Sequence, residues 1–271
     1  MIQAFKMAMK SISGNKFRAF LTMLGIIIGV MALVILVSLV SGATGTVTDT
    51  ISSLGSNLLT VTISDDKGAP VTLDTLDEWM ADPQIGLAAP SATATATGKY
   101  SSTTKTVTVY GATPAYAPIN GQSVLLGRFL TQADVENHTS VCVITEKTAE
   151  DMVGYTDCLG EEISLDGRKF TIVGIMKNDD ESLTGILTKN NMTAYIPFTT
   201  LMRLSSTVSS TITSFSVSAP ADGNVTTTEA AMKRLLLERF EDDEDAFSLL
   251  SQNMLEDAMS SVTGILTVLL G

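Results

Sequence analysis

The residue types that could carry chemistry are few and scattered along this chain. His138 is the only histidine, and its surroundings, ENHTS, favour a loop residue over a metal ligand or a catalytic acid–base group. A serine–histidine–acid site would have to use it, and the chain has no G-x-S-x-G nucleophile turn. The chain also lacks the G-x4-G-K-[ST] phosphate loop of ATPases. We therefore predict no catalytic residue, no metal site and no cofactor, and we do not expect the chain itself to be an enzyme.

Two acidic runs could in principle bind a cation. The longer run, Glu238 to Asp245, reads ERFEDDED, and the shorter run at 179–181 reads DDE. A calcium loop needs alternating oxygen ligands around a central glycine, which the longer run does not contain. We interpret the longer run as a solvated helix end with its loop, and the shorter run as a loop after a strand.

The two cysteines, Cys142 and Cys158, have fifteen residues between them. Zinc sites use four ligands at closer spacing, so this pair does not indicate a metal centre. A disulfide between them is one interpretation, if the domain lies in an oxidising compartment. Two free, half-buried thiols are the other, and the sequence leaves both open.

Basic residues precede a long apolar run at the start of the chain. The early charges are Lys6, Lys10, Lys16 and Arg18. The next charged residue is Asp49, and the uncharged run 20–42 would form a helix of roughly 34 Å, enough for a bilayer core of about 30 Å. A cleaved signal peptide is the alternative, but its apolar region is usually shorter. We predict a retained membrane helix over 19–42, with the basic residues cytoplasmic by the positive-inside rule.

Two further features accompany the predicted span. Residues 2–12 have helical apolar spacing with two lysines beside it, which predicts a short helix in the inner membrane interface within the cytoplasmic segment 1–18. Gly25 and Gly29 form a G-x-x-x-G, a spacing that lets a second helix approach closely. Incidental glycine, which is common in membrane helices, is the alternative.

The rest of the chain is acidic. The net charge of the whole chain is −12, although every charge in the first 18 residues is positive. Nucleic-acid binding needs Lys and Arg to neutralise phosphates, so we exclude nucleic acid as a partner. The abundance of Thr, Ser, Val and Ala after residue 42 is typical of a β-rich extracellular domain, which we expect at 43–258.

Periodicity in this acidic part predicts an α+β domain. The expected strands are 57–63, 92–97, 105–110, 141–144, 162–165, 169–176, 195–198, 214–219 and 247–250. The expected helices are 75–80 with Asp74 as N-cap, 131–136, 146–153 ending at Gly154, 199–204 and 227–240. A polar loop is expected at 98–104, and Asp166-Gly167 predicts a hairpin turn. Arg128 either pairs with an acid such as Asp134 or faces water.

The chain ends in a second uncharged run, 260–271. Its twelve residues are too few to cross a bilayer. We interpret 259–271 as the start of a second membrane helix that is cut short at residue 271. A C-terminal amphipathic segment is the alternative.

Five segments carry a family signal when they are taken in order. They are NKFRAFLTMLGIIIGVMALVILVSL, ISSLGSNLLTV, VYGATPAYAPINGQSVLLGRFLTQADVENHTSVCVI, LGEEISLDGRKFTIVGIM and TAYIPFTTL. The third contains a G-x-T-P-x-Y turn, a G-R-F step and a D-V pair before an expected buried strand. Together they resemble the MacB-type and FtsX-like permease subunits of ABC transporters, and the resemblance covers nearly the whole chain.

The resemblance implies a cell-membrane permease with one large extracytoplasmic domain between its first two membrane helices. That domain would have an α/β part near the membrane, built from both chain ends, and a β-rich middle insertion at about 90–200. The implied partners are a separate ABC ATPase subunit, a second permease copy or paralogue, an extracytoplasmic adaptor or cargo, and membrane lipid. ATP hydrolysis by the partner would move this domain to export or extract amphiphilic cargo or peptides, a coupling called mechanotransmission.

The expected fold class is therefore α+β: a transmembrane helix, a mixed α/β extracytoplasmic domain with a β-rich middle insertion, and the start of a second transmembrane helix. A membrane-anchored extracellular binding or sensing module without transport is the second hypothesis. Further apolar spans beyond residue 271 would favour the permease, and a natural stop there would favour the anchored module.

Overall fold

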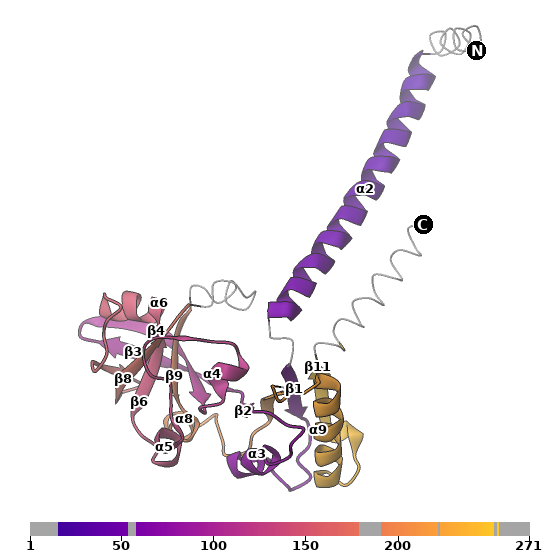
Figure 1. The fold of residues 1–271 in the computed structure, drawn as a ribbon. Helices are drawn as coiled ribbons and strands as arrows, with labels where there is room; N and C mark the ends of the chain where they lie inside the picture. Colours follow the sequence, from indigo (N-terminus) through magenta and orange to yellow (C-terminus); the bar gives the residue numbers. More distant parts are fainter. Residues whose placement is uncertain (1–15, 54–57, 179–190, 222, 252–253, 255–271) are drawn as a thin grey trace. The chain divides into compact units, whose positions relative to one another are not determined.

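The computed structural model describes residues 16–53, 58–178, 191–221, 223–251 and 254. The chain divides into two compact units, one formed by Met1–Asp49 with Asp257–Gly271 and the other by Thr50–Glu256. Figure 1 labels the helices and strands of both units. The expectations for Lys6, Lys10, residues 2–12, 179–181 and 259–271 lie outside the described residues.

Helix α2 (Lys16–Ser53) accounts for the described part of the first unit. Large apolar side chains are exposed along it, and the consecutive residues Ile26, Ile27 and Ile28 are 55–66% exposed. Three neighbouring positions point about 100° apart around a helix, so the exposed apolar surface is not confined to one face. Among the residues that the structure describes, no helix is both long enough and apolar enough to cross a membrane.

A four-stranded antiparallel sheet is built from both ends of the second unit. Its order is β11-β1-β10-β2, and its strands are β1 (Leu58–Ile63), β2 (Ala88–Pro90), β10 (Ser214–Ser218) and β11 (Phe247–Ser251). The strands β1 and β2 come before the rest of the unit in sequence, and β10 and β11 come after it. This arrangement is the expected α/β part made from both chain ends.

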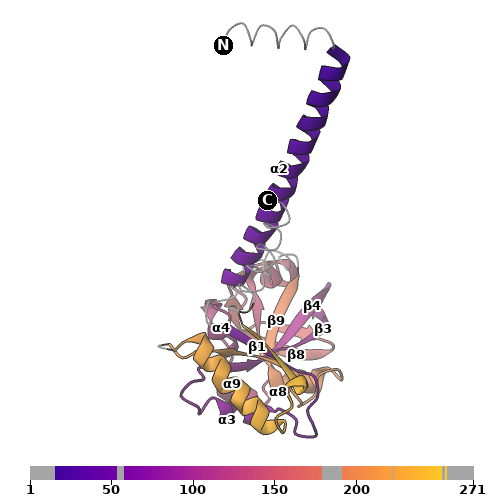
Figure 2. The same ribbon diagram turned by 90° about the vertical axis from the view of Figure 1, so that its right-hand side faces the viewer.

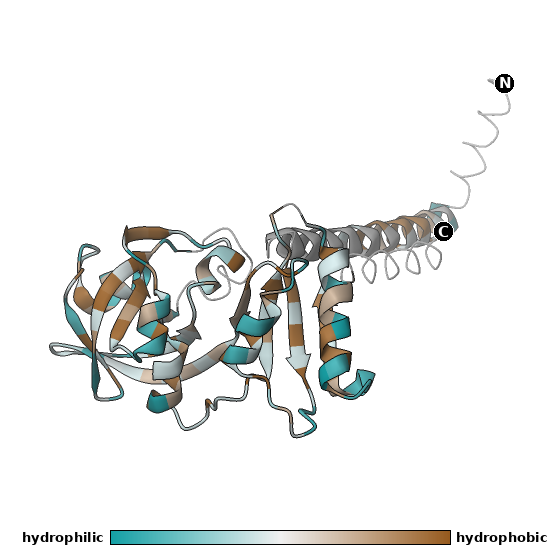
Figure 3. Ribbon diagram, turned by 60° about the horizontal axis from the view of Figure 1, so that its bottom comes forward, coloured by the Kyte–Doolittle hydropathy of each residue, from teal (hydrophilic) through white to brown (hydrophobic). Residues whose placement is uncertain are grey.

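Alternation along the strands decides which face of this sheet is buried. Leu59, Val61 and Ile63 of β1 are buried, while Thr62 between them is exposed. Helices α3 (Leu73–Trp79) and α9 (Val225–Arg239) pack on the apolar face and form one core cluster with it. Figures 1 and 2 both show α9 alongside the sheet, and Figure 3 shows apolar and polar residues alternating along its strands and along α9. We call this sheet with α3 and α9 the four-stranded lobe.

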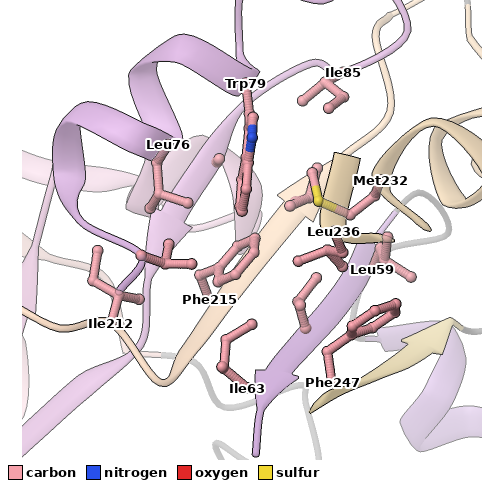
Figure 4. Close-up of a cluster of buried hydrophobic side chains, with 14 of the residues drawn as sticks. Leu59, Ile63, Leu76, Trp79, Ile85, Ile212, Phe215, Met232, Leu236 and Phe247 are labelled. Atoms are coloured by element: carbon pink, nitrogen blue, oxygen red, sulfur yellow. The ribbon is translucent and has the colours of Figure 1, made fainter. Parts of the chain in front are cut away.

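The centre of that core is an aromatic contact. The rings of Trp79 and Phe215 lie 5.7 Å apart between centroids, and Figure 4 shows them facing one another with Leu76 beside them. Met232 and Leu236 of α9 approach from the other side. Burying large aromatic side chains contributes several kcal/mol each, so this contact fixes α3 on the sheet.

A seven-stranded sheet is formed by the middle of the chain. Its order is β5-β8-β6-β9-β4-β3-β7, and β7 also pairs with β8, so the sheet closes on itself. The pairs β4–β9 and β6–β8 are parallel, and the other pairs are antiparallel. The strands are β3 (Ala92–Tyr100), β4 (Thr103–Ala112), β5 (Val124–Gly127), β6 (Val141–Thr145), β7 (Glu162–Leu165), β8 (Arg168–Met176) and β9 (Met192–Pro197).

Short helices lie between or after the strands of this second sheet along the chain. They are α4 (Tyr116–Ile119), α5 (Gln132–Glu136), α6 (Glu146–Thr148) continued by the π-helical turn η1 (Ala149–Val153), and α8 (Phe198–Leu204). The turn η2 (Glu244–Ala246) belongs instead to the four-stranded lobe. We call the seven-stranded sheet with α4, α5, α6, η1 and α8 the seven-stranded lobe. It is the β-rich middle that the fold class predicted.

Two local expectations are confirmed. Asp166 and Gly167 have φ angles of 46° and 83°, the pair of positive values that a two-residue type I′ hairpin turn requires. Gly154 ends the helical segment 146–153 in the left-handed conformation, with φ of 97°.

Two other local expectations are wrong. The N-cap of α3 is Thr72, not Asp74, because the Thr72 backbone N–H donates to Thr75 Oγ1 at 3.3 Å and Asp74 lies within the first turn. The polar segment 98–104 is not a loop, since its residues pair across β3 and β4 down to Tyr100 and Thr103. Polar side chains on the solvent side do not prevent backbone pairing, so polarity alone misled the prediction.

We expect Phe215→Ala to lower the free energy of unfolding by about 3–5 kcal/mol, because Phe215 is fully buried and its loss leaves a cavity beneath Trp79. The neighbouring Ser216→Ala, on the other face of β10, should change it by less than about 0.5 kcal/mol. Urea unfolding of the whole chain, followed by the fluorescence of its single tryptophan, measures both. Equal effects of the two substitutions would contradict this assignment of the sheet faces.

Candidate functional site

A mainly apolar cavity of about 440 Å³ lies where the two lobes of the second unit meet. Helix α3 and the segment from it to β2 line one side. The turn before α4, α4 itself, α5, His138 and the start of α8 line the other side. The volume falls in the range of about 300–1,000 Å³ that small-molecule sites occupy.

On the four-stranded side, α3 divides its residues between the core and the cavity rim. Trp79 faces the core cluster, and Leu76 contributes to both the core and the cavity wall. Asp74 and Asp77 are three residues apart, so they lie on one side of the helix, exposed and lining the cavity. The core contacts of α3 therefore decide where two carboxylates stand.

On the seven-stranded side, the five-residue helix α5 is held by a buried carboxylate. Asp134 is only 5% exposed and accepts hydrogen bonds from Arg128 Nη1 at 2.6 Å and Nη2 at 3.3 Å. It also accepts from the Thr131 backbone N–H at 2.9 Å and hydroxyl at 2.7 Å, and from the Thr139 hydroxyl at 3.1 Å. A helix this short is not stable alone, so these bonds supply what helix propensity cannot.

The pKa of Asp134 reports how well this carboxylate is satisfied. Burial by itself would raise it, but hydrogen bonds from Arg128, Thr131 and Thr139 outweigh burial and lower the pKa to about 2. The ionised form is therefore the one that the fold stabilises. From the sequence, Arg128 either pairs with an acid or faces water, and the structure shows that it pairs with Asp134.

The G-R-F step explains why Arg128 reaches Asp134. Gly127 has φ of 73°, and the Arg128 backbone N–H donates to Val173 O at 3.0 Å, which places this backbone directly against β8. A Cβ on Gly174 would overlap the Arg128 carbonyl, so both glycines permit a close approach. The approach leaves the Arg128 side chain to turn toward α5, where its Nη1 also donates to Phe129 O at 3.0 Å.

Helix α8 adds a second attachment to the same wall. The hydroxyl of Thr199 donates to Val135 O at 2.5 Å, and that of Thr200 donates to Thr139 O at 3.0 Å. These bonds tie α8 to α5 and to the residues that follow it. Val135, Glu136 and Thr199 are thereby fixed as one continuous wall of the cavity.

The carboxylates of the cavity come from both lobes. Asp74 and Asp77 belong to α3 and Glu136 belongs to α5. Burial raises the pKa of Asp77, and repulsion from Asp74 and from Glu136 raises it further. No lysine or arginine is among the described residues that line the cavity.

Two residues that line the cavity each have a buried side-chain atom without a hydrogen-bond partner within the described part of the chain. The atoms are Thr113 Oγ1 and His138 Nδ1. Thr113 is 9% exposed, and His138 has φ of 51° in the loop after α5. His138 is thus a loop residue, as expected, but the sequence did not indicate that it faces a cavity.

The other residues singled out from the sequence lie away from this cavity. Lys16 and Arg18 are exposed at the start of α2, and a Cβ on Gly25 or Gly29 would meet no atom within 4 Å. Whether the two glycines pack against another helix stays a prediction.

The cysteines are both buried in the core of the seven-stranded lobe. The structure contains them as free thiols, but they are fully buried and not half-buried as the second interpretation had it. Burial raises the pKa of the Cys142 thiol well above its usual range, with a smaller contribution from Cys158 nearby. A thiol that is hard to ionise is a weak nucleophile, so neither chemistry nor metal binding is indicated here.

The acidic run 238–245 is a helix end and turn, as expected. Asp243 caps η2 through the Asp245 backbone N–H at 2.9 Å and pairs with Lys67 at 2.6 Å. Glu244 pairs with Lys233 at 2.9 Å. The described residues contain no group of three or more His, Cys, Asp or Glu side chains placed to hold a metal ion.

The cavity residues are what sequence reasoning missed. From the sequence, Asp77 and Glu136 are indicated only as helix residues, and Asp74 is predicted as an N-cap. The one usable signal was the G-x-T-P-x-Y turn, which places Thr113 and Pro114 at the cavity. Nothing in the sequence shows that this turn lies opposite α3.

Comparisons with known proteins agree on a family. A family model described as the MacB-like periplasmic core domain matches residues 19–235. The macrolide export ATP-binding/permease protein MacB of Neisseria gonorrhoeae is 26% identical over 276 residues, which cover 99% of this chain and 42% of that protein. The protein of the same name from Wolinella succinogenes is 26% identical over 277 residues, covering 100% and 42%. The chain spans about two fifths of the length of these curated relatives.

Solved structures share the fold. The crystal structure of the periplasmic region of MacB from Actinobacillus actinomycetemcomitans matches with a TM-score of 0.63 at 20% identity, covering 78% of this chain and 95% of that one. The extracellular domain of the noncanonic ABC-type transporter YknZ from Gram-positive bacteria matches with a TM-score of 0.58 at 20% identity, covering 72% and 100%. At this identity the likeness establishes the fold alone, and it confirms the expected mixed α/β domain.

We expect Asp134→Asn to lower the free energy of unfolding at pH 7 by about 2 kcal/mol, because it removes a buried carboxylate that accepts hydrogen bonds from Arg128, Thr131 and Thr139. The control is Asp151→Asn, which removes a surface i,i+4 pair with Lys147 and should cost less than about 0.5 kcal/mol. Urea unfolding followed by circular dichroism measures both.

The pH dependence of stability, compared between the original chain and Asp134→Asn, tests whether the ionised carboxylate is responsible. The folded-state pKa of Asp134, about 2, lies below its ordinary value of 3.8, so its stabilisation is complete above about pH 4 and is lost as the pH falls toward 2. The difference between the original chain and Asp134→Asn should therefore shrink over that interval. A difference that stays constant from pH 7 to pH 2 would refute the role of the ionised carboxylate.

Proposed function

Because the chain belongs to the MacB-like periplasmic core domain family, we propose that it is part of an ABC-transporter permease whose extracytoplasmic domain moves when a separate ATPase hydrolyses ATP. The observation that carries the proposal is the family match over 19–235, together with alignment to MacB permeases over 99% of the chain. The motion would serve the export or extraction of an amphiphile or a peptide.

In this proposal the apolar run 19–42 lies in the membrane and holds the second unit on the outer side. It is supported by the absence of charge between Arg18 and Asp49 and by the exposed apolar side chains of α2, among them Phe20 at 61% and Ile35 at 59%. Exposed apolar surface of this extent is costly in water and favourable in lipid. Lys16 and Arg18 would then stand at the cytoplasmic boundary.

A mechanical role suits the construction of the second unit. The chain passes between the two lobes twice, at Ser91 from β2 to β3 and at 205–213 from α8 to β10. The lobes also share a packed contact, because Phe198 of α8 is buried in the core of the four-stranded lobe, and this contact would have to rearrange for the lobes to change their angle. A second permease copy or an adaptor would meet the outer surface of this unit.

The rival function, an anchored binding or sensing module, is favoured by one observation. The cavity between the lobes has the size and apolar lining of a small-molecule site. Ligand binding in this cavity is compatible with both the permease and the anchored module. The two functions differ in whether ATP hydrolysis by a partner depends on this chain.

The orientation can be tested by cysteine labelling. The native thiols are at most 1% exposed and should not react with a maleimide. Labelling therefore reports on the introduced cysteine alone, either Ser102→Cys in the β3–β4 turn or Lys16→Cys at the start of α2. With a membrane-impermeant maleimide, and any outer membrane removed, we expect Ser102→Cys to react in intact cells and Lys16→Cys to react only after permeabilisation. The reverse pattern, or equal labelling of the two variants in intact cells, would refute the proposed topology.

The coupling can be tested by affinity purification of the natural protein from its own cells in mild detergent. We expect a second protein with a phosphate loop to copurify and to hydrolyse ATP. The matched control replaces the phosphate-loop lysine of that partner by alanine, which should abolish ATP hydrolysis without dissociating the complex. Purification of the protein without any phosphate-loop partner would refute a separate ATPase and favour the anchored module.

A further inference from the structure

We propose that a second, smaller cavity binds one neutral sugar ring, either as a free sugar or as part of a glycan. The cavity, which we call the tyrosine pocket, has a volume of about 230 Å³. It is lined by Ala89, Ser91, Thr93, Tyr110, Tyr116, Asn120 and Ser216. The proposal goes beyond transport, because it concerns a ligand that neither the permease nor the anchored module requires.

The tyrosine pocket is separate from the larger cavity, although β2 contributes to both. Ala88 and Pro90 line the larger cavity, whereas Ala89 lines the tyrosine pocket together with Ser91 just after the strand. Successive residues of a strand point to opposite faces, so the two cavities lie on opposite sides of β2. Helix α4, which lies beside β2, supplies Tyr116 to the tyrosine pocket (Figure 1).

Two tyrosine rings supply the apolar surface of this pocket. The ring centroids of Tyr110 and Tyr116 are 6.1 Å apart, and each lies 5.4 Å from the ring centroid of Tyr195. The ring of Phe129 contacts Tyr195 at a centroid distance of 6.0 Å. These contacts hold the two lining rings in place before a ligand binds. The face of an aromatic ring is negatively polarised, so it attracts the C–H bonds on the flat side of a sugar ring.

The hydroxyl groups around these rings are available to a ligand. Within the described part of the chain, no hydrogen-bond partner is found for the side-chain hydroxyls of Ser91, Thr93, Tyr110, Tyr116 and Ser216. Tyr110, Tyr116 and Ser216 are only partly buried and their hydroxyl oxygens are accessible, so a molecule in the pocket can reach them. Burial raises the pKa of both tyrosines, so each keeps its proton and can both donate and accept.

The chemistry of the lining favours a neutral polyol. None of the described residues that line the pocket carries a charge. An ion would lose its hydration in a pocket that offers no counter-ion, and this loss is costly. A sugar hydroxyl both donates and accepts, as the lining hydroxyls do. Asn120 donates through Nδ2 to Tyr116 O at 2.8 Å, which leaves its Oδ1 as a further acceptor.

The size of the pocket limits the ligand to one ring, and the neighbouring strand shows where a glycan would continue. A volume of about 230 Å³ lies below the range of about 300–1,000 Å³ that drug-sized ligands need. Thr93 pairs with Tyr110 across β3 and β4, and Thr95 and Thr97 follow on the same face of β3. Both of these threonines are exposed. The adjoining units of a glycan would lie on this row of hydroxyls.

The test uses the whole chain in lipid nanodiscs prepared without sugar-headed detergent, with binding measured by saturation-transfer difference NMR. The probes are glucose, galactose, mannose and N-acetylglucosamine. Sorbitol is the matched control ligand, because it has hydroxyls like those of glucose but no ring. We expect at least one of the sugars to bind saturably with a Kd of about 1–10 mM, and sorbitol to bind at least about fivefold more weakly. Saturation should be strongest at ring C–H protons.

Variants assign the binding to the tyrosine pocket. Tyr116→Phe keeps the ring but removes the hydroxyl, so it should weaken sugar binding about three- to tenfold. Tyr155→Phe is the matched control and should bind unchanged, because Tyr155 is 47% exposed and does not line the pocket. Ser216→Leu places a larger side chain in the pocket and should abolish detectable binding. Circular dichroism shows whether each variant is folded.

A second arm of the experiment distinguishes a free sugar from a glycan. It compares the sugar that binds with a linear tetrasaccharide of the same sugar, in the original chain and in the double variant Thr95→Ala with Thr97→Ala. For a glycan, the tetrasaccharide should bind at least about fivefold more tightly than the single sugar, and the double variant should remove this gain. Equal affinities identify a free sugar as the ligand.

Each outcome decides the proposal. Saturable binding of a sugar that Tyr116→Phe weakens and Tyr155→Phe leaves unchanged supports it. The proposal is overturned by the absence of saturable binding for all four sugars, by equal binding of sorbitol, or by full binding in Ser216→Leu. An equal loss in Tyr155→Phe and Tyr116→Phe also overturns it. The assay needs neither ATP nor an ATPase, so its result is distinguishable from success or failure of the proposed transport function.

Discussion

The buried carboxylate of Asp134 is the interaction on which the seven-stranded side of the cavity depends. Five hydrogen bonds from Arg128, Thr131 and Thr139 converge on its two oxygens. A helix of five residues is not stable alone, so these bonds stabilise α5 together with the burial of Val135. Helix α8 donates to the carbonyls of Val135 and Thr139, so the same carboxylate contributes to the position of α8.

The opposite wall depends on a core instead of an ion pair. Helix α3 has seven residues and is held by the burial of Leu76 and Trp79 against the four-stranded sheet. Both walls are therefore short helices fixed by tertiary contacts. Helix α8 links the two lobes, because Phe198 is buried in the core of the four-stranded lobe and Leu201 is buried in the core of the seven-stranded lobe.

Most strands and the hairpin turn at Asp166-Gly167 could be predicted because alternation and turn chemistry are local, but the short strands β2 and β5 were not expected. The Asp74 cap was wrong because Thr72, two residues earlier, also has a capping side chain, and only the structure shows that α3 begins after Thr72. The family motifs marked the right segments, but their purpose needs three dimensions: Gly127 permits an approach to β8 that no sequence pattern displays. The sequence could not show that Asp77 and Glu136 line the same cavity, because the two residues belong to different lobes.

Carboxylates from two lobes make the cavity differ from an ordinary apolar cleft. Asp74 and Asp77 line it from α3, and Glu136 lines it from α5. Burial is the main cause of the raised pKa of Asp77, and the negative charges of Asp74 and Glu136 raise this pKa further. A charge on one lobe therefore affects the ionisation of a group on the other lobe.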